Sequence, residues 1–271
     1  MSRILKTLPA LMVLVTVVAA PAAAPAAADD QLTIVSPNTS KKFSLKELQK
    51  KLSAVTVTID DPVYKTKKTF DGFKLDDVLA LAGSLHGVDE IVFAAKDGYS
   101  PTIALEKIKG KRGVIAFQEH AAKGKFANVK QGKAWISPAP YYLIWLDPVG
   151  KDFPWSYQLV KIEFVSFEKK FPKLYPKGAK ADSDVMKGFT HFKGLCLRCH
   201  SMNLEGGDLG PELNVPKNIT EYWDRDVISA FIKKPESFRA KSKMPAFEGV
   251  LNDEQIDEVI EYLEYMKKVK L

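Results

Sequence analysis

The chain has 271 residues, of which 46% are hydrophobic and 27% are charged. That length is sufficient for two domains with packed cores, and the composition is typical of a folded, globular protein. The 40 basic and 33 acidic residues give a net charge of +7, but the lysines are scattered and no nucleic-acid-binding motif accompanies them. We therefore expect no nucleic-acid partner.

The beginning of the chain has the composition of a targeting segment. Arg3 and Lys6 precede an apolar run over residues 8–20, and small residues follow as far as Ala28. This pattern predicts a secretory signal peptide over residues 1–28, and hence a periplasmic or otherwise exported protein. An uncleaved anchor is the alternative, but the run is shorter than the roughly 20 residues that cross a bilayer, so no stable membrane insertion is expected after cleavage.

Residues 29–170 predict an α+β domain. A capping-box pattern begins a short helix over residues 44–52, and the segment 74–83 is a second helix that ends at a glycine. Alternating or continuous apolar runs predict strands at residues 54–60, 89–95, 112–118, 141–146 and 157–167.

After this domain the composition of the sequence changes. Prolines, lysines and a glycine interrupt the apolar pattern, which indicates a linker over residues 171–183. The remainder, residues 184–271, is predicted to be all-α, with helices at 184–195, 225–233 and 253–268. These helices enclose a long loop rich in glycine and proline. Below roughly 100 residues such an arrangement commonly needs a cofactor to complete its core.

The two cysteines of the chain are Cys196 and Cys199, and His200 follows directly. In an exported protein a disulfide within C-x-x-C, as in thiol oxidoreductases, is one interpretation. The adjacent histidine favours covalent haem attachment instead. Each sulfur would then bond to one vinyl group of the porphyrin, and the histidine would be the proximal ligand of the iron.

The surroundings of this motif resemble the three-helix c-type cytochromes, from residue 184 to the C-terminus. The shared order is G-x3-F-x3-C-x2-C-H, then G-P-x-L, then M-P, and then a final helix with an aromatic residue. In this sequence these features are Gly188, Phe192, Gly210, Pro211, Leu213, Met244 and Tyr262.

The resemblance implies one covalent haem c, attached through Cys196 and Cys199. His200 would be the proximal ligand and Met244 the distal one, while the Pro211 carbonyl would accept a hydrogen bond from the other ring nitrogen of His200. With both axial positions filled, the haem would transfer electrons rather than catalyse a reaction. We therefore expect no catalytic residues.

The resemblance also implies that Gly188 and Phe192 pack against the last helix near Tyr262. Other side chains could be the sixth iron ligand instead of Met244. These alternatives are Met186, Met202, Met266 and His191. The histidines at 86, 120 and 191 are otherwise expected to be ordinary surface or structural residues.

The first domain resembles, more loosely, the molybdopterin-binding domain of the sulfite oxidase-like oxidoreductases. The resemblance lies in the order of elements, including VTVTIDD followed by FDGFKLDDVLALAG. That family holds its metal through a cysteine thiolate, where this sequence has Asp60 and Asp61 and no cysteine. Molybdenum is therefore not expected, although a non-covalently held pterin remains open.

A different ligand site in the first domain is a further hypothesis. The candidate residues are Asp60, Asp61, Asp97, Tyr99 and His120. The alternative is turn chemistry, because Asp61-Pro62 and Asp97-Gly98 are common turn pairs.

The leading interpretation is an exported mono-haem electron carrier with an N-terminal docking or ligand-binding domain. The alternative is an oxidoreductase whose N-terminal domain oxidises a small substrate and passes electrons to the haem, and a haem-based sensor is a third possibility. Basic residues before Met244 predict a positive rim for an acidic redox partner. They are Lys233, Lys234, Arg239, Lys241 and Lys243.

Overall fold

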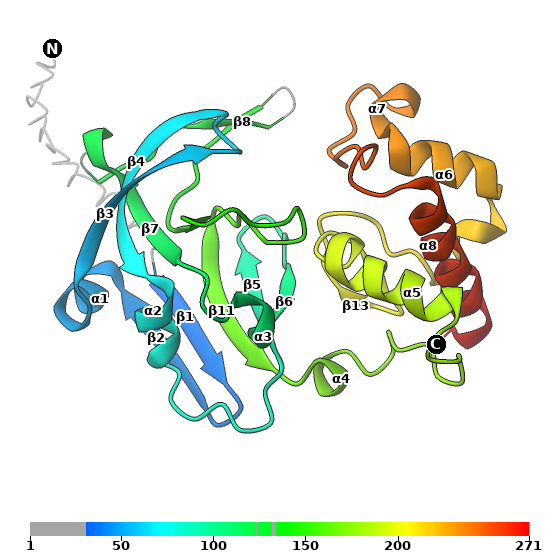
Figure 1. Cartoon of the computed structure of the whole chain (residues 1–271), viewed down its shortest axis with the longest axis horizontal. Coiled ribbons are helices and arrows are strands. Elements are labelled where there is room, and N and C mark those ends of the chain that lie inside the picture. The colour runs from blue at the N-terminus through cyan, green and yellow to red at the C-terminus, as the bar shows by residue number, and fades with distance from the viewer. Residues whose placement is uncertain (1–30, 123, 132–133, 271) are drawn as a thin grey trace, which may run out of the picture.

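The computed structural model describes residues 31–122, 124–131 and 134–270. The predicted signal peptide lies outside these residues. Figure 1 shows two parts side by side, which we call the N-terminal region (residues 31–170) and the C-terminal region (residues 184–270). The first is built on sheets and the second on helices, as predicted. Within the described residues, no helix has the length and apolar character needed to cross a membrane.

Two sheets form the N-terminal region among the described residues. The first has the order β2-β1-β11-β5-β6, in which β1 runs parallel to β11 and the other neighbours are antiparallel. Its strands are β1 (Gln31–Ser36), β2 (Thr39–Ser44), β5 (Glu90–Ala95), β6 (Thr102–Ala104) and β11 (Leu159–Val165).

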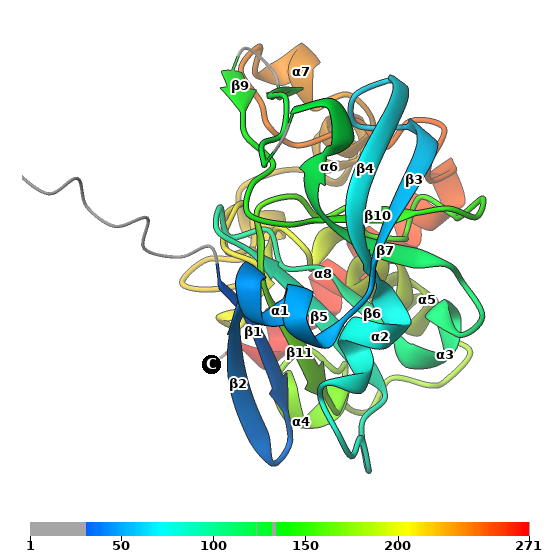
Figure 2. The same ribbon diagram turned by 90° about the vertical axis from the view of Figure 1, so that its left-hand side faces the viewer.

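The second sheet is antiparallel, with the order β10-β7-β4-β3. Its strands are β3 (Ala54–Asp61), β4 (Thr66–Lys74), β7 (Gly113–Glu119) and β10 (Tyr142–Trp145). The long β3–β4 hairpin extends beyond the first sheet (Figure 2). Side chains of both sheets share one buried cluster, in which Phe73 and Ile115 meet Phe93 and Ile162. A smaller hairpin pairs β8 (Val129–Gln131) with β9 (Ala134–Ile136).

The five predicted strands are confirmed as β3, β5, β7, β10 and β11. No strand was predicted from the sequence at β1, β2, β4, β6, β8 or β9. In β2 the first four residues are exposed, and β4 begins with the four polar residues TKKT, so neither has the apolar content that signals a strand. Both segments form strands because neighbouring strands supply their backbone hydrogen bonds.

Short helices connect the strands. They are α1 (Leu45–Lys51), α2 (Leu75–Ala80), α3 (Leu105–Ile108) and α4 (Phe167–Lys170). The capping box is present at α1, since Ser44 Oγ accepts from the Glu47 backbone N–H and the Glu47 carboxylate accepts from the Ser44 N–H at 2.8 Å. α2 is shorter than predicted, because the chain leaves the helix and turns through Gly83, whose φ is +80°.

The C-terminal region consists of helices α5, α6, α7 and α8 joined by loops (Figure 1), and these loops carry the end of the cysteine motif and Met244. The helices are α5 (Asp184–His191), α6 (Arg225–Lys233), α7 (Pro235–Phe238) and α8 (Asp253–Met266). Minor elements are a π turn (Phe192–Cys196), 3-10 turns (Ile219–Glu221 and Lys267–Val269) and a two-residue pair, β12 (Ser201–Met202) with β13 (Glu205–Gly206).

Helices α5 and α8 cross at very close range. A Cβ added at Gly188 would lie 1.8 Å from the Glu258 carbonyl oxygen, so only glycine fits this crossing. Next to it, the rings of Phe192 and Tyr262 pack with centroids 5.1 Å apart. The predicted packing of Gly188 and Phe192 against the last helix is therefore confirmed.

The segment 171–183, predicted as a linker, is packed against α8. Phe171 and Leu174 are buried, the Tyr262 hydroxyl donates to the Leu174 carbonyl at 2.8 Å, and the Tyr265 hydroxyl donates to the Lys177 carbonyl at 2.7 Å. The buried cluster of the C-terminal region also includes Val92 and Val165 from the first sheet. The two regions thus share apolar contacts, while the connecting segment 171–183 has three buried residues and is otherwise mostly exposed.

Candidate functional site

The two cysteines lie on one tight turn at the end of the π turn. The backbone N–H groups of Cys199 and His200 both donate to the Cys196 carbonyl, at 3.1 and 2.9 Å. Both thiols are free. Burial raises the pKa of Cys196 to about 12 and that of Cys199 to about 11, while the positive charge of Arg198 opposes this shift in both. At neutral pH the turn therefore presents two protonated thiols.

His200 is held by the chain that follows it. Its Nδ1 donates to the Pro211 carbonyl at 2.8 Å, which is the hydrogen bond that the resemblance implied. A Cβ at Gly210 would lie 2.7 Å from the ring, so the absence of a side chain there lets the backbone pass closely. Burial lowers the pKa of His200 and favours the neutral imidazole. Nε2 is then the nitrogen that remains for a metal ion.

Met244 lies on the loop between α7 and α8. It is partly buried, packs against the core of the C-terminal region, and its backbone N–H donates to Ser242 Oγ at 3.2 Å. An aromatic group lies on and before α6 and α7 of the same region: Phe231 packs on Trp223 and on Phe238, with centroids 5.0 and 5.7 Å apart. Phe238 is nevertheless 49% exposed, so apolar surface remains to be covered.

The alternative sixth ligands have other positions. Met202 and Met266 are fully buried in the apolar core, and Met186 packs at its edge. The Nε2 of His191 lies 3.0 Å from the buried carboxylate of Glu258. These contacts are structural, as expected for core methionines and a paired histidine.

These observations fit a haem c. The described residues offer two free thiols on one turn, an imidazole oriented by a carbonyl through Nδ1, and partly exposed apolar side chains in a small helical region. A porphyrin bonded to Cys196 and Cys199 would hold its iron within reach of His200. Met244 has the soft thioether sulfur that suits the opposite face.

Two of the five cations of the predicted basic rim are paired with acidic side chains. Lys233 pairs with Asp253 at 2.9 Å, and Lys234 pairs with Glu248 at 3.0 Å. The Arg239 guanidinium lies over the Trp223 and Phe231 rings, about 5.8 and 5.9 Å from their centroids. The prediction overlooked acidic partners that are distant in sequence. Arg239, Lys241 and Lys243 make no ion pair within the described residues.

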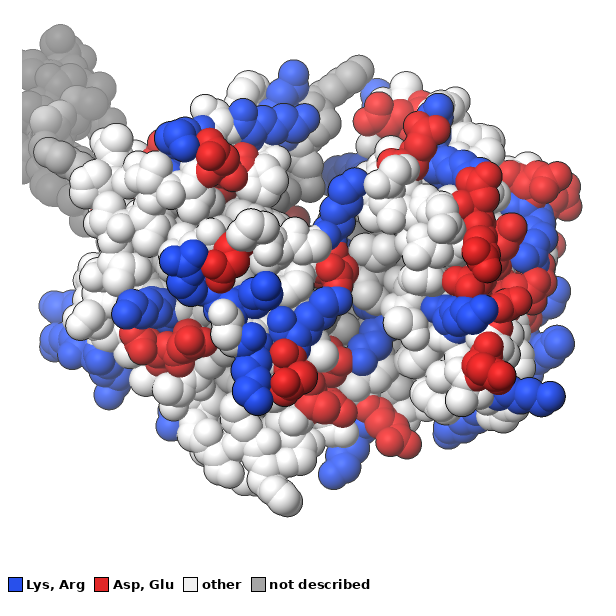
Figure 3. All heavy atoms as spheres, in the orientation of Figure 1, with Lys and Arg blue, Asp and Glu red and all other residues white. Residues whose placement is uncertain are grey.

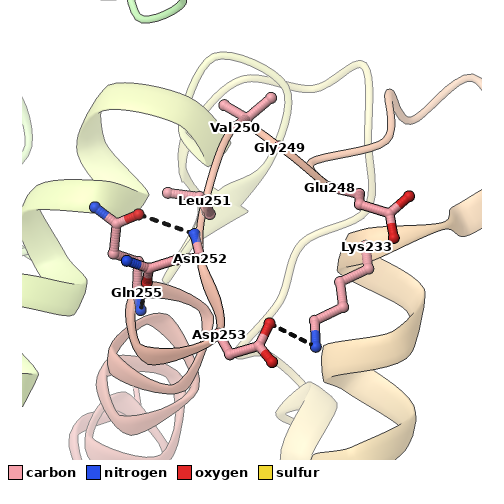
Figure 4. A pocket seen from close by; sticks show the side chains of 8 residues that line it. All are labelled: Lys233, Glu248, Gly249, Val250, Leu251, Asn252, Asp253 and Gln255. Carbon is pink, nitrogen blue, oxygen red and sulfur yellow. Dashed lines mark hydrogen bonds and ion pairs between the residues drawn. The ribbon is translucent and has the colours of Figure 1, made fainter.

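Acidic side chains gather on the side of the C-terminal region formed by α6 and α8 (Figure 3). There Arg225 pairs with Glu261 at 3.0 Å and with Glu264 at 3.2 Å. A polar surface pocket lies between the end of α6 and the start of α8 (Figure 4). Its walls include the Lys233–Asp253 pair and the Asn252 cap of α8. None of its lining residues belongs to the cysteine motif.

In the N-terminal region, the carboxylates of Asp61 and Asp97 stabilise turns, as the alternative interpretation predicted. The Asp61 carboxylate is 2% exposed and accepts from the backbone N–H groups of Val63 and Tyr64, both at 2.8 Å, and from the Tyr142 hydroxyl at 3.0 Å. The Asp97 carboxylate accepts from the Tyr99 backbone N–H at 3.1 Å.

Asp60 and His120 do not form a site with Asp61 and Asp97. Asp60 is exposed and pairs with Lys67, whereas His120 Nδ1 lies 2.9 Å from the Asp71 carboxylate. Among the described residues, no group of three or more His, Cys, Asp or Glu side chains could hold a metal ion. Asp71 also accepts from Gln118 at 2.6 Å, and no local sequence signal indicated this cluster.

The cysteine motif lies against the N-terminal region, which the sequence analysis did not predict. The Ser100 backbone N–H donates to the Arg198 carbonyl at 2.9 Å, and the Arg198 guanidinium donates to the Tyr99 hydroxyl at 3.3 Å. Lys193 forms an ion pair with the buried Glu90 of β5. Figure 1 shows β5 and β6 on the side of the sheet that faces α5.

Comparison with known proteins identifies the helical part. Residues 183–263 match the family described as cytochrome c oxidase, cbb3-type, subunit III. A cytochrome c of Kluyveromyces lactis is 27% identical over 112 residues, which cover 34% of this chain and 94% of that protein. A cytochrome c homolog of Rickettsia bellii is 35% identical over 86 residues, covering 25% of this chain and 49% of that protein.

Among solved structures, the sulfane dehydrogenase SoxCD of Paracoccus pantotrophus is similar, with a TM-score of 0.36 and 14% identity. The match covers 50% of this chain and 38% of that one. The chain thus spans less than half the length of both SoxCD and the Rickettsia homolog. The sequence matches and the helical fold agree for one part of the molecule: the C-terminal region is a cytochrome c domain, whose function is electron transfer.

Proposed function

We propose that the protein is an exported electron carrier with one covalent haem c and no molybdenum. In this proposal residues 29–170 form a docking or ligand-binding domain, residues 171–183 connect it, and residues 184–271 form the cytochrome domain. The signal peptide over residues 1–28 would direct export to the periplasm or an equivalent compartment. The partner would be another redox protein.

The observation that carries this proposal is the geometry around His200. The Nδ1 hydrogen bond to Pro211 fixes the ring so that Nε2 is the nitrogen left to bind iron. The same turn supplies the thiols of Cys196 and Cys199. Two thioether bonds and one axial ligand would thus come from five consecutive residues.

When bound, the haem supplies a one-electron redox couple. The chain's own residues decide how it is used. His200 and Met244 would hold the iron and exclude other ligands, and the Pro211 carbonyl would keep the imidazole in one tautomer. The apolar side chains of the C-terminal region, among them Leu213 and Trp223, would exclude water from the porphyrin.

Analysis of protein expressed in a compartment that attaches haem c tests the proposal. We expect one iron per chain, a haem that survives acid-acetone extraction, and no molybdenum. A haem that is extracted, or an iron content well below one, would contradict covalent attachment. Molybdenum or a pterin in the purified protein would contradict the carrier proposal and favour an enzyme.

One observation favours a second candidate, an oxidoreductase that passes electrons from the N-terminal region to the haem. The turn at Tyr99 and Ser100 lies directly on the cysteine motif, so an electron donor bound there would be close to the porphyrin. The missing cysteine argues against molybdenum as that donor. Reduction of the haem by a small substrate, without any added protein, would decide for this candidate.

A further inference from the structure

Arg198, between the two cysteines, has an unusual environment for a charged side chain. Its guanidinium donates to the Asp152 carbonyl at 2.9 Å, to the Tyr99 hydroxyl at 3.3 Å, and to the Gly194 carbonyl. Its Nε is buried and has no hydrogen-bond partner among the described residues. All of these acceptors are neutral, so they satisfy hydrogen bonds without cancelling the charge.

Lys193, which also contacts the N-terminal region, differs from Arg198 because its charge is neutralised by an ion pair. Lys193 pairs with the carboxylate of Glu90, which is 4% exposed and also accepts from Thr102 Oγ1 at 2.8 Å. Arg198 has no ion pair within the described residues, and the carboxylate of Asp152 pairs with Lys107 instead. Lys193 of the π turn and Arg198 of the cysteine motif thus both contact the N-terminal region. The charge of Lys193 is neutralised there, whereas Arg198 has no ion-pair partner among the described residues.

An uncompensated cation in a partly buried position acts strongly on its neighbours, because little water screens it. Arg198 lies on the same turn as both thiols, next to Cys199 and two residues from Cys196. Those sulfurs are the positions at which a haem would be bonded. Ferric haem carries one more positive charge than ferrous haem, so a cation here destabilises the ferric form.

We propose that Arg198 raises the reduction potential of the haem, and that the N-terminal region acts as a positioning element which holds its guanidinium in place. The Tyr99 hydroxyl and the Asp152 carbonyl are the groups that do so. This inference rests on the proposed haem attachment. It gives the N-terminal region a role in electron transfer that requires no metal of its own.

The test is a redox titration of the purified holoprotein, followed by haem absorbance. Arg198→Gln removes the charge and should lower the midpoint potential, whereas Arg198→Lys keeps the charge and should lower it less. Tyr99→Phe keeps every charge and should give a small shift in the same direction, because the guanidinium loses one of its anchors.

Two controls separate charge from structure. Lys151 donates to the Gly249 carbonyl at 3.0 Å across the same two regions but is exposed. Lys151→Gln therefore removes one charge and one contact, and should leave the potential unchanged. The double variant Glu90→Gln with Lys193→Gln removes a neutral pair and should lower the thermal unfolding midpoint without moving the potential.

A wild-type potential in Arg198→Gln, at full haem content, would overturn the inference. Equal shifts in Arg198→Gln and Lys151→Gln would also overturn it, since position would then be irrelevant. If Arg198→Gln retains no haem, Tyr99→Phe decides, and an unchanged potential there rejects the positioning role. Absence of covalent haem from the wild-type protein would instead refute the proposed function.

Discussion

The two regions of this molecule complete their cores in different ways. In the N-terminal region large side chains such as Phe73, Phe93 and Trp145 are almost fully buried between the sheets. In the C-terminal region Tyr222 and Phe238 are about half exposed, at 50% and 49%, and Met244 is only partly covered. Trp135 of the β8–β9 hairpin is also exposed, at 66%, and the C-terminal region has a buried core of its own around Phe192 and Tyr262. We infer that a bound group covers the partly exposed side chains of the C-terminal region.

Removing the attachment points should have the largest effect. Cys196→Ser, Cys199→Ser and an alanine at His200 should each prevent the C-terminal region from folding, because the porphyrin would form much of its core. Circular dichroism should show loss of helix with the strand signal retained. A full acid-acetone-resistant haem signal in both cysteine variants would refute attachment at this motif.

The opposite experiment weakens the N-terminal region alone. Phe73 is 0% exposed and its ring packs on Phe117 at 5.1 Å, so Phe73→Ala should cost about 3–5 kcal/mol of unfolding free energy. In urea the strand signal should be lost earlier while the haem absorbance stays at its wild-type midpoint. If both signals shift together, the packing of Val92 and Val165 against the helical core unites the regions in one cooperative unit.

Opening the sixth position should leave the fold intact and change the haem. Met244→Ala should lower the midpoint potential and allow carbon monoxide to bind the reduced protein, because a soft ligand that favours Fe(II) is lost. Met186→Ala is a matched control, with the same substitution at the edge of the core, and should not bind carbon monoxide. A wild-type protein that binds carbon monoxide readily would favour a sensor.

The smallest effect is expected from the surface charges near Met244. Lys241→Glu with Lys243→Glu should slow electron exchange with an acidic partner at low salt by less than about tenfold, since Lys233 and Lys234 are already paired and the Arg239 charge remains. The same reversal at Lys109 and Lys111 is the control. Because screening acts over about 8 Å at physiological salt, rates that do not respond to salt would place recognition elsewhere.

Local patterns in the sequence predicted those features that depend on neighbouring residues. The capping box of Ser44 and Glu47 was visible because it acts across three residues, and α6 begins and ends where the apolar spacing predicted. The turns at Asp61 and Asp97 likewise follow from side chains that bind backbone groups two residues ahead. The cysteine motif belongs to the same class, since its reactive groups lie within five residues.

Only the tertiary structure decided how distant segments meet. The parallel pairing of β1 with β11 joins Thr33 to Lys161, and apolar periodicity carries no information about which strand pairs with which. The position of Leu174 along α8 depends on the Tyr262 hydroxyl, which lies far along the chain. The sequence by itself determined the chemistry of the cysteine motif. Its contact with the N-terminal region through Arg198 required the folded molecule, because packing and buried charge are properties of neighbours in space.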